Sequence, residues 1–156
     1  MTNIGVFCSS LDGEKIFSEK TKELGAVIAK ENYSLVYGGG KLGLMGDLAK
    51  SVKENGSAVI SVIPSYLNKP NIIFDESDKI YETKNLFERK KKLIELSDVL
   101  IALPGGIGTL DEVFDVDLTK DNWKQVYNSS DESRRRYEFL GKPDLKLDPN
   151  LSPIEF

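Results

Sequence analysis

The stretch that decides the fold is Val99-Leu100-Ile101-Ala102-Leu103-Pro104-Gly105-Gly106-Ile107-Gly108-Thr109-Leu110-Asp111-Glu112. Its apolar start is short and ends at a proline, which predicts a buried parallel strand. A helix is predicted over residues 110–118, with Thr109 as its N-cap. Three glycines between a strand and a helix let backbone N–H groups surround an anion at the positive end of the helix dipole. The junction is therefore a candidate phosphate site; a plain tight turn with a capping box from Thr109 to Glu112 is the alternative.

The rest of the chain alternates between short apolar runs and segments with helical periodicity. The other expected strands span residues 4–8, 34–37, 58–63 and 78–82. The other expected helices span residues 12–31, a segment ending near residue 54, and residues 85–97. This alternation predicts the α/β class, with a Rossmann-like, doubly wound parallel sheet. Ligands of such sheets bind beyond the carboxyl ends of the strands.

A chain of 156 residues suits one domain with one core. We expect residues 1–118 to form a Rossmann-like nucleotide-binding domain. Residues 119–156 hold 11 hydrophobic residues of 38, against 51 of 118 before them. This divergent segment is expected to form an edge strand at best, as part of the same domain, or to be loosely ordered.

A second glycine-rich junction, Gly38-Gly39-Gly40-Lys41-Leu42-Gly43-Leu44-Met45-Gly46, follows the expected strand at 34–37. Five glycines in nine residues cost much backbone entropy. The junction therefore predicts close approach of a ligand or of another backbone segment. Packing of a helix against the sheet is the alternative explanation.

Composition excludes several classes of function. The chain has no histidine, which removes Ser-His-Asp and Cys-His catalysis and histidine-based zinc sites, and we expect no metal site. A net charge of −4 argues against a nucleic-acid-binding protein. No apolar run approaches the roughly 18 residues needed to span a bilayer, and the first residues lack the charged region of a secretory signal. The single cysteine, Cys8, is expected to be buried and suits a reducing, cytoplasmic setting.

Four consecutive cations, Arg89-Lys90-Lys91-Lys92, lie on the helix expected over 85–97. They wrap more than a full turn, so they cannot all face one way. The last two lysines lie at salt-bridge spacing from Glu88, and Lys91 also from Glu95, which is typical of surface residues. Arg89 shares an inward stripe with three leucines and needs a partner. A bound phosphate, or a carboxylate such as Glu112, would provide one.

Three motifs together resemble those of the Lonely Guy (LOG) family. They are Gly38-Gly39-Gly40 with Gly43-Leu44-Met45-Gly46, then Glu88-Arg89-Lys90, and then Pro104 to Glu112, in the right order over about residues 4–119. The family comprises cytokinin riboside 5′-monophosphate phosphoribohydrolases and often carries the label "possible lysine decarboxylase". The resemblance implies a hydrolase that needs no cofactor and cleaves the N-glycosidic bond of a nucleoside 5′-monophosphate, such as AMP, to a free base and ribose 5-phosphate. The decarboxylase label finds no support, because a recognisable Schiff-base lysine motif is lacking.

The resemblance also implies that Arg89 and Glu112 are the catalytic pair. The residues implied to contact the nucleotide are Gly40, Met45, Lys90, Gly105, Gly106, Ile107, Gly108, Thr109, Leu110, Asp111 and Thr119. Breaking the bond between ribose and base builds positive charge on the sugar, which a carboxylate such as Glu112 can stabilise while it orients water. Asp111 points about 100° away on the helix and cannot form a facing pair with it.

The chain departs from the family pattern at two places. Asn71 stands where the family has a glutamate, so one substrate contact is altered. Three residues, Lys120-Asp121-Asn122, separate Thr119 from Trp123, which the family places next to each other. An insertion of this size keeps Trp123 on nearly the same helical face if the segment stays helical, whereas a break would move it away.

The resemblance implies a homodimer whose interface completes the site. The apolar residues Leu86, Phe87, Val113 and Phe114 are expected to offer the surface for it. The alternative function is a binding or carrier protein, in which the same fold holds a nucleotide or a pterin-type cofactor without turnover.

Overall fold

The computed structural model describes the backbone of residues 1–119 and 126–128 and the side chains of residues 1–116. Its strands are β1 (Asn3–Phe7), β2 (Ser34–Tyr37), β3 (Val59–Pro64), β4 (Lys79–Thr83), β5 (Val99–Ala102) and β6 (Val126–Asn128). Its helices are α1 (Lys15–Lys30), α2 (Gly43–Glu54), the 3-10 turn η1 (Ser65–Leu67), α3 (Leu86–Leu96) and α4 (Ile107–Thr119). The predicted elements therefore all form, with ends that differ by a few residues.

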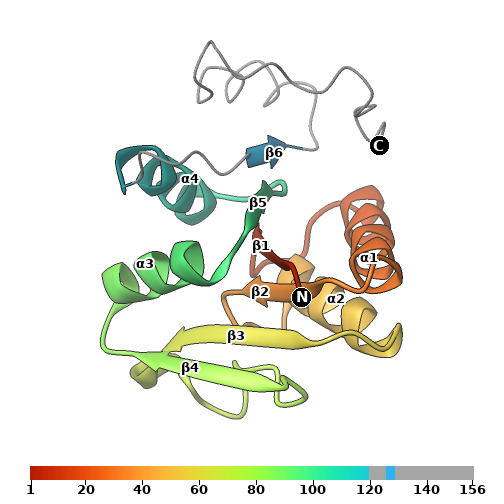
Figure 1. The fold of residues 1–156 in the computed structure, drawn as a ribbon, viewed down its shortest axis with the longest axis horizontal. Coiled ribbons are helices and arrows are strands. Elements are labelled where there is room, and N and C mark those ends of the chain that lie inside the picture. Colours follow the sequence, from red (N-terminus) through yellow and green to blue (C-terminus); the bar gives the residue numbers. More distant parts are fainter. Residues whose placement is uncertain (120–125, 129–156) are drawn as a thin grey trace.

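The six strands make one parallel sheet in the order β4-β3-β2-β1-β5-β6. Helices α1 and α2 cover one face, and α3 and α4 cover the other (Figure 1). The chain moves outward from β1 to β4, crosses back, and continues on the other side of β1 with β5 and β6. The predicted doubly wound α/β fold is confirmed.

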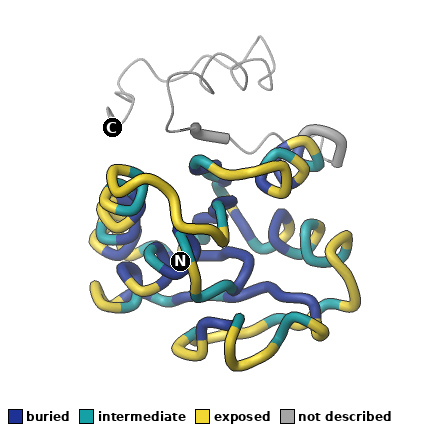
Figure 2. The backbone as a smooth tube through the Cα atoms, turned by 180° about the vertical axis from the view of Figure 1, so that it is seen from behind, coloured by how far each residue is buried: buried dark blue, intermediate teal, exposed yellow. Residues whose placement is uncertain are grey.

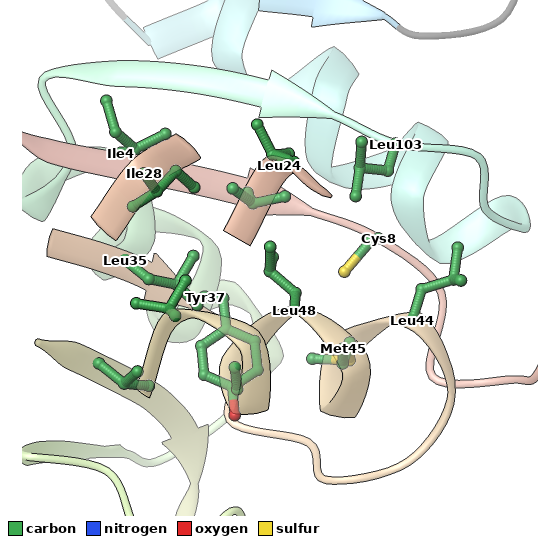
Figure 3. Close-up of a cluster of buried hydrophobic side chains, with 14 of the residues drawn as sticks. Ile4, Cys8, Leu24, Ile28, Leu35, Tyr37, Leu44, Met45, Leu48 and Leu103 are labelled. Atoms are coloured by element: carbon green, nitrogen blue, oxygen red, sulfur yellow. The ribbon is translucent and has the colours of Figure 1, made fainter. Parts of the chain in front are cut away.

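Each face of the sheet buries its own apolar cluster. The cluster under α1 and α2 includes Leu24, Leu35, Leu48 and Val52, and its members point toward one another from both helices and the sheet (Figure 3). The cluster under α3 and α4 includes Val36, Leu93 and Leu100. Full burial of one such side chain contributes about 1.5–3 kcal/mol. Figure 2 shows that the buried residues run through the centre of the molecule and that the exposed residues lie at its periphery.

The predicted N-cap of the last described helix is wrong. The helix α4 begins at Ile107, and the carbonyl of Gly106 accepts hydrogen bonds from the N–H groups of Thr109 (3.1 Å) and Leu110 (3.3 Å). Thr109 therefore lies inside the first turn and the capping box to Glu112 does not form. Glycine is itself an acceptable N-cap residue, and this lets the helix start earlier than the apolar pattern indicates.

The four apolar residues expected at a surface divide into two groups. Leu86, Phe87 and Phe114 are exposed, but Val113 is completely buried in the cluster under α3 and α4. The expectation for Val113 is wrong because it lies on the face of α4 turned toward the sheet. In the described part of the chain, no helix combines the length and apolar character needed to cross a membrane. The predictions for Trp123 and for the tail at 129–156 lie outside the described residues.

Candidate active site

The site lies where the strand order reverses. Strands β1 and β5 are neighbours, and the N–H of Leu103 still donates to the carbonyl of Phe7 (2.8 Å) just beyond them. The chain then leaves β1 toward α1 and leaves β5 toward α4. The loops at this carboxyl edge diverge, which is the place where doubly wound sheets bind ligands.

A local hydrogen-bond pattern fixes the start of α3. The side chain of Asn85 accepts from the N–H of Glu88 (2.9 Å), and the carboxylate of Glu88 accepts from the N–H of Lys84 (3.0 Å). The first of these bonds satisfies a donor that the first turn of a helix leaves without an intrahelical partner, and the second ties the residue before the N-cap to the same turn. Together they place Arg89 in the first turns of α3, facing the sheet.

Arg89 reaches across the ends of the central strands. Its Nε donates to the carbonyl of Val62 (3.2 Å), and one terminal nitrogen lies 3.5 Å from the carbonyl of Gly38. A Cβ on Gly38 would collide with the guanidinium, so a side chain at this position of the first glycine motif would force Arg89 to move. The other terminal nitrogen lies 3.5 Å from Oε1 of Glu112. The predicted inward cation and its predicted carboxylate partner are thus brought together.

Glu112 is a buried carboxylate, with a side chain only 11% exposed. Burial raises its pKa; Arg89 and Lys90 act in the opposite direction, and Asp111 adds to the rise. Its net pKa is above that of an ordinary glutamate. A buried carboxyl group with a raised pKa, held beside an arginine at the edge of the sheet, is suited to stabilise positive charge and to accept a proton.

Lys90, the neighbour of Arg89, lies next to α4. Its Nζ is 2.8 Å from Oδ2 of Asp111 and 2.6 Å from Oδ2 of Asp115. Two residues that the family resemblance implies as nucleotide contacts, Lys90 and Asp111, therefore contact each other. Asp115 was not singled out from the sequence, although it follows Asp111 by four residues and so lies on the same side of the helix.

The junction before α4 is exposed over the four residues 105–108. Open space surrounds the Cβ positions of Gly106 and Gly108, whereas a Cβ on Gly105 would collide with the side chain of Thr109. Thr109 is buried beneath the loop, and Leu110 is partly buried. The first N–H groups of a helix have no intrahelical acceptors, so this accessible turn can receive an anion.

The second glycine junction is packed against the chain itself. The methyl group of Met45 and the guanidinium of Arg89 both lie against Gly38, and the sulfur of Met45 lies against Gly40. Gly43, at φ +59°, packs on the backbone of Leu11. The predicted close approach of another backbone segment is therefore present, and Gly40 and Met45 form the wall next to Arg89.

Two features of the site were not assigned from the sequence. Cys8 is buried, as expected, but it is also close enough to Glu112 and Arg89 for both charges to influence its pKa. Burial raises the pKa of this thiol, and Glu112 raises it further against the effect of Arg89, so it stays protonated. The hydroxyl of Tyr37 donates to the carbonyl of Gly40 (3.1 Å) and supports the glycine loop. The adjacency of β1, β2 and β5 brings these groups together, and a linear motif does not reveal it.

Within the described residues, no group of three or more His, Cys, Asp or Glu side chains could hold a metal ion. Thr119 ends α4, and its side chain lies outside the described set. Lys91 is exposed, as expected, and Lys92 pairs with Glu95 (3.6 Å) instead of with Glu88, because the carboxylate of Glu88 is turned back to cap α3.

The sequence of this chain is similar to those of known enzymes. The chain is 40% identical over 114 residues to the cytokinin riboside 5′-monophosphate phosphoribohydrolase LOG1 of Arabidopsis thaliana, covering 72% of this chain and 54% of that protein. It is 36% identical over 112 residues to the cytokinin riboside 5′-monophosphate phosphoribohydrolase of Mycobacterium tuberculosis, covering 72% and 60%. The chain thus spans little more than half the length of these curated relatives.

Solved structures give the same fold. The molybdenum cofactor carrier protein of Chlamydomonas reinhardtii is 29% identical and superposes with a TM-score of 0.74, covering 89% of this chain and 84% of that one. A family model described as "Possible lysine decarboxylase" matches residues 45–126, which are 82 of the 156 residues. With the phosphoribohydrolase relatives, this match over more than half of the chain shows that the protein belongs to the LOG family.

Proposed function

We propose that this protein hydrolyses the N-glycosidic bond of a nucleoside 5′-monophosphate with an adenine or cytokinin-type base. The products are the free base and ribose 5-phosphate. The observation that carries the proposal is the buried pair of Arg89 and Glu112, 3.5 Å apart, beside the exposed N-terminal turn of α4. The similarity to cytokinin riboside 5′-monophosphate phosphoribohydrolases supports it.

The reaction needs a negative group near the sugar and a positive site for the phosphate. As the bond between C1′ and the base nitrogen breaks, its electron pair leaves with the base and positive charge builds on the ribose. Ionised Glu112 stabilises that charge and takes a proton from the water whose oxygen bonds to C1′. Glu112 then passes that proton to the departing base, directly or through water, and is ionised again. Arg89 keeps Glu112 ionised and oriented.

The remaining predicted contacts complete the proposal. The N–H groups of residues 105–108 hold the phosphate, with Thr109, Leu110 and Asp111 next to them. Gly40 and Met45 face the nucleotide beside Arg89, and Thr119 contacts it from the end of α4. Lys90 belongs to the same region of the site.

We also propose that the active form is a cytoplasmic homodimer. The exposed side chains of Leu86 and Phe87 on α3 and of Phe114 on α4 supply an apolar surface for a second copy. Phe87 is 70% exposed, which is unusual for a phenylalanine in a monomeric protein.

The test is turnover. Purified protein is incubated with AMP and with N6-modified adenosine monophosphates, and released base is measured by chromatography. Wild type is expected to release base, and Glu112→Ala is expected to release at least 100-fold less. Absence of free base with every nucleotide, or equal release by the variant, would contradict the proposal.

A carrier function is the second candidate. The specific observation that favours it is the 29% identity to the molybdenum cofactor carrier protein over 84% of that chain. A carrier would bind its ligand without turnover. Calorimetry with AMP beside the turnover assay separates the two functions, because tight binding without released base supports the carrier.

A further inference from the structure

The three-glycine loop at residues 38–40 has each of its carbonyl groups engaged by a different part of the chain. The first carbonyl lies 3.5 Å from a terminal nitrogen of Arg89. The second accepts a hydrogen bond from the N–H of Phe74 (2.9 Å), and the third accepts one from the hydroxyl of Tyr37 (3.1 Å). Because glycine has more backbone freedom than any other residue, these contacts decide which conformation the loop holds.

Tyr37 and Arg89 reach this loop from opposite faces of the sheet. Tyr37 is completely buried, and its ring lies in the cluster under α1 and α2 (Figure 3). Arg89 belongs to α3 on the other face, and its guanidinium fills the space beside Gly38. The side chain of Met45 packs against both Gly38 and Gly40, so the two ends of the loop cannot shift independently. The acceptor of Arg89 therefore depends on a loop whose far end is held by the Tyr37 hydroxyl.

We propose that Tyr37 is a positioning residue of the site, whose hydroxyl fixes the glycine loop and, through it, the guanidinium of Arg89 beside Glu112. Tyr37 has no exposed surface, so it acts without touching the nucleotide. Burial raises the pKa of this phenol, so it stays protonated and holds the loop as a hydrogen-bond donor. The effect of Tyr37 on turnover rests on the proposed function, whereas its hold on Arg89 does not.

The carboxyl group of Glu112 reports where Arg89 lies. Burial raises the pKa of Glu112, Arg89 and Lys90 of α3 lower it, and Asp111 of α4 raises it. The thiol of Cys8, just after β1, is close to the same carboxyl group and stays neutral. If Arg89 moves away, one of the lowering effects weakens and the pKa of Glu112 rises further. A loss of stability elsewhere in the sheet leaves this pKa unchanged.

The first arm of the test needs no nucleotide. The carboxyl carbon of Glu112 is followed by NMR during a pH titration of wild type, Tyr37→Phe and the control Tyr33→Phe, with Glu112→Gln to assign the signal. Tyr33 precedes β2 at the opposite end of the strand, so the control loses the same chemical group away from the loop. The titration midpoint is expected to shift to higher pH in Tyr37→Phe and to stay unchanged in the control. A wild-type midpoint in Tyr37→Phe would overturn the proposal.

A mutant cycle then tests whether the effect passes through Arg89. In the Arg89→Met background, Tyr37→Phe is expected to leave the midpoint of Glu112 where it is, because the guanidinium is already absent. If Tyr37→Phe still shifts the midpoint in that background, Tyr37 acts on Glu112 by another route and the proposal is wrong.

The second arm measures turnover of AMP. The kcat/KM of Tyr37→Phe is expected to be about tenfold below that of wild type, the effect of one lost hydrogen bond on a site residue. The control Ser51→Ala removes a buried hydrogen bond to the carbonyl of Lys22 (2.7 Å), far from the loop. It is expected to lower stability without changing kcat/KM. An equal loss of kcat/KM in both variants would show that the rate follows stability alone, and would overturn the proposal.

The two arms separate failure of the proposal from failure of the proposed function. If wild type neither binds nor hydrolyses AMP, the proposed function is wrong, and the titration of Glu112 still decides whether Tyr37 positions Arg89. Should Tyr37→Phe fail to fold, Ser61→Ala takes its place, because buried Ser61 hydrogen-bonds the Tyr37 hydroxyl. The same rise in the midpoint of Glu112 is expected, and an unchanged midpoint would contradict the proposal.

Discussion

The guanidinium of Arg89 occupies the space beside the α-carbon of Gly38 that any side chain would otherwise fill. Arg89 comes from α3 on one face of the sheet, and Gly38 directly follows β2 in its centre. The first glycine of the Gly38-Gly39-Gly40 motif therefore makes room for a residue of the site.

Replacement of Gly38 by alanine should displace Arg89. A Cβ at this position would collide with the guanidinium and with the methyl group of Met45. A shift of about 1 Å in a site residue can lower the rate by about 100-fold, and we expect a loss of that size in kcat/KM. The control is Gly13→Ala, where a Cβ makes only ordinary van der Waals contacts, with Phe17 and Leu44. Unchanged turnover in Gly38→Ala would show that Arg89 has another position in the working enzyme.

Glu112 should make stability depend on pH. Its folded-state pKa is raised, so between the unfolded and folded pKa values the folded protein binds more protons than the unfolded chain. The free energy of unfolding of wild type should therefore fall, relative to that of Glu112→Gln, as pH rises through this window. Below the unfolded pKa, about 4.3, the difference between the two proteins should become constant. Urea unfolding of both proteins from pH 3.5 to 8 measures this difference in the free energy of unfolding. If the difference does not vary with pH, the raised pKa of Glu112 is contradicted.

Leu48 should be a major contributor to stability. It is completely buried between α2 and the sheet (Figure 3). Leu48→Ala should lower the free energy of unfolding by about 2–5 kcal/mol, because it removes buried methyl groups and leaves a cavity. Val27→Ala, at a position of α1 that is 45% exposed, should change it by about 0.5 kcal/mol or less. Chemical denaturation compares the two variants.

The exposed aromatic residue on α3 should mediate self-association. Light scattering of wild type is expected to give twice the chain mass of 17.4 kDa. Phe87→Glu introduces a charge into the proposed interface and should give the mass of one chain. Ile16→Glu, on α1 at the opposite face of the sheet, should leave the dimer intact. A wild-type mass of 17.4 kDa would refute the homodimer.

The sequence predicts the fold because its local signals agree with one another. The mainly apolar sequences of β2 and β3 indicate strands buried on both faces, and the periodicity of α1 indicates one covered stripe. The inward direction of Arg89 also follows from periodicity, since only one side of α3 carries leucines. Local pattern alone did not predict where α4 begins, because glycine is acceptable both as an N-cap and within the first turn.

Contacts between distant segments could not be predicted in this way. The proximity of Cys8 to Glu112, and of Gly38 to Arg89, depends on the order of strands in the sheet. Whether Lys90 contacts a ligand or the carboxylates of α4 depends on how α3 and α4 pack. Periodicity gives the side of a helix that a residue occupies, but not which neighbour meets it.

The place of β1 in the sheet has a consequence for how the chain acquires its structure. β1 is made first, yet one of its two partners is β5, whose pairing joins Ile4 to Val99 across 95 residues. During synthesis the edge of β1 stays open until residue 102 has left the ribosome. Contacts of such long sequence separation slow folding, because much chain entropy is lost before they form. Among the described strands that are paired on both sides, β1 therefore waits longest for its second partner, and its open edge stays available in that time to chaperones or to another nascent chain.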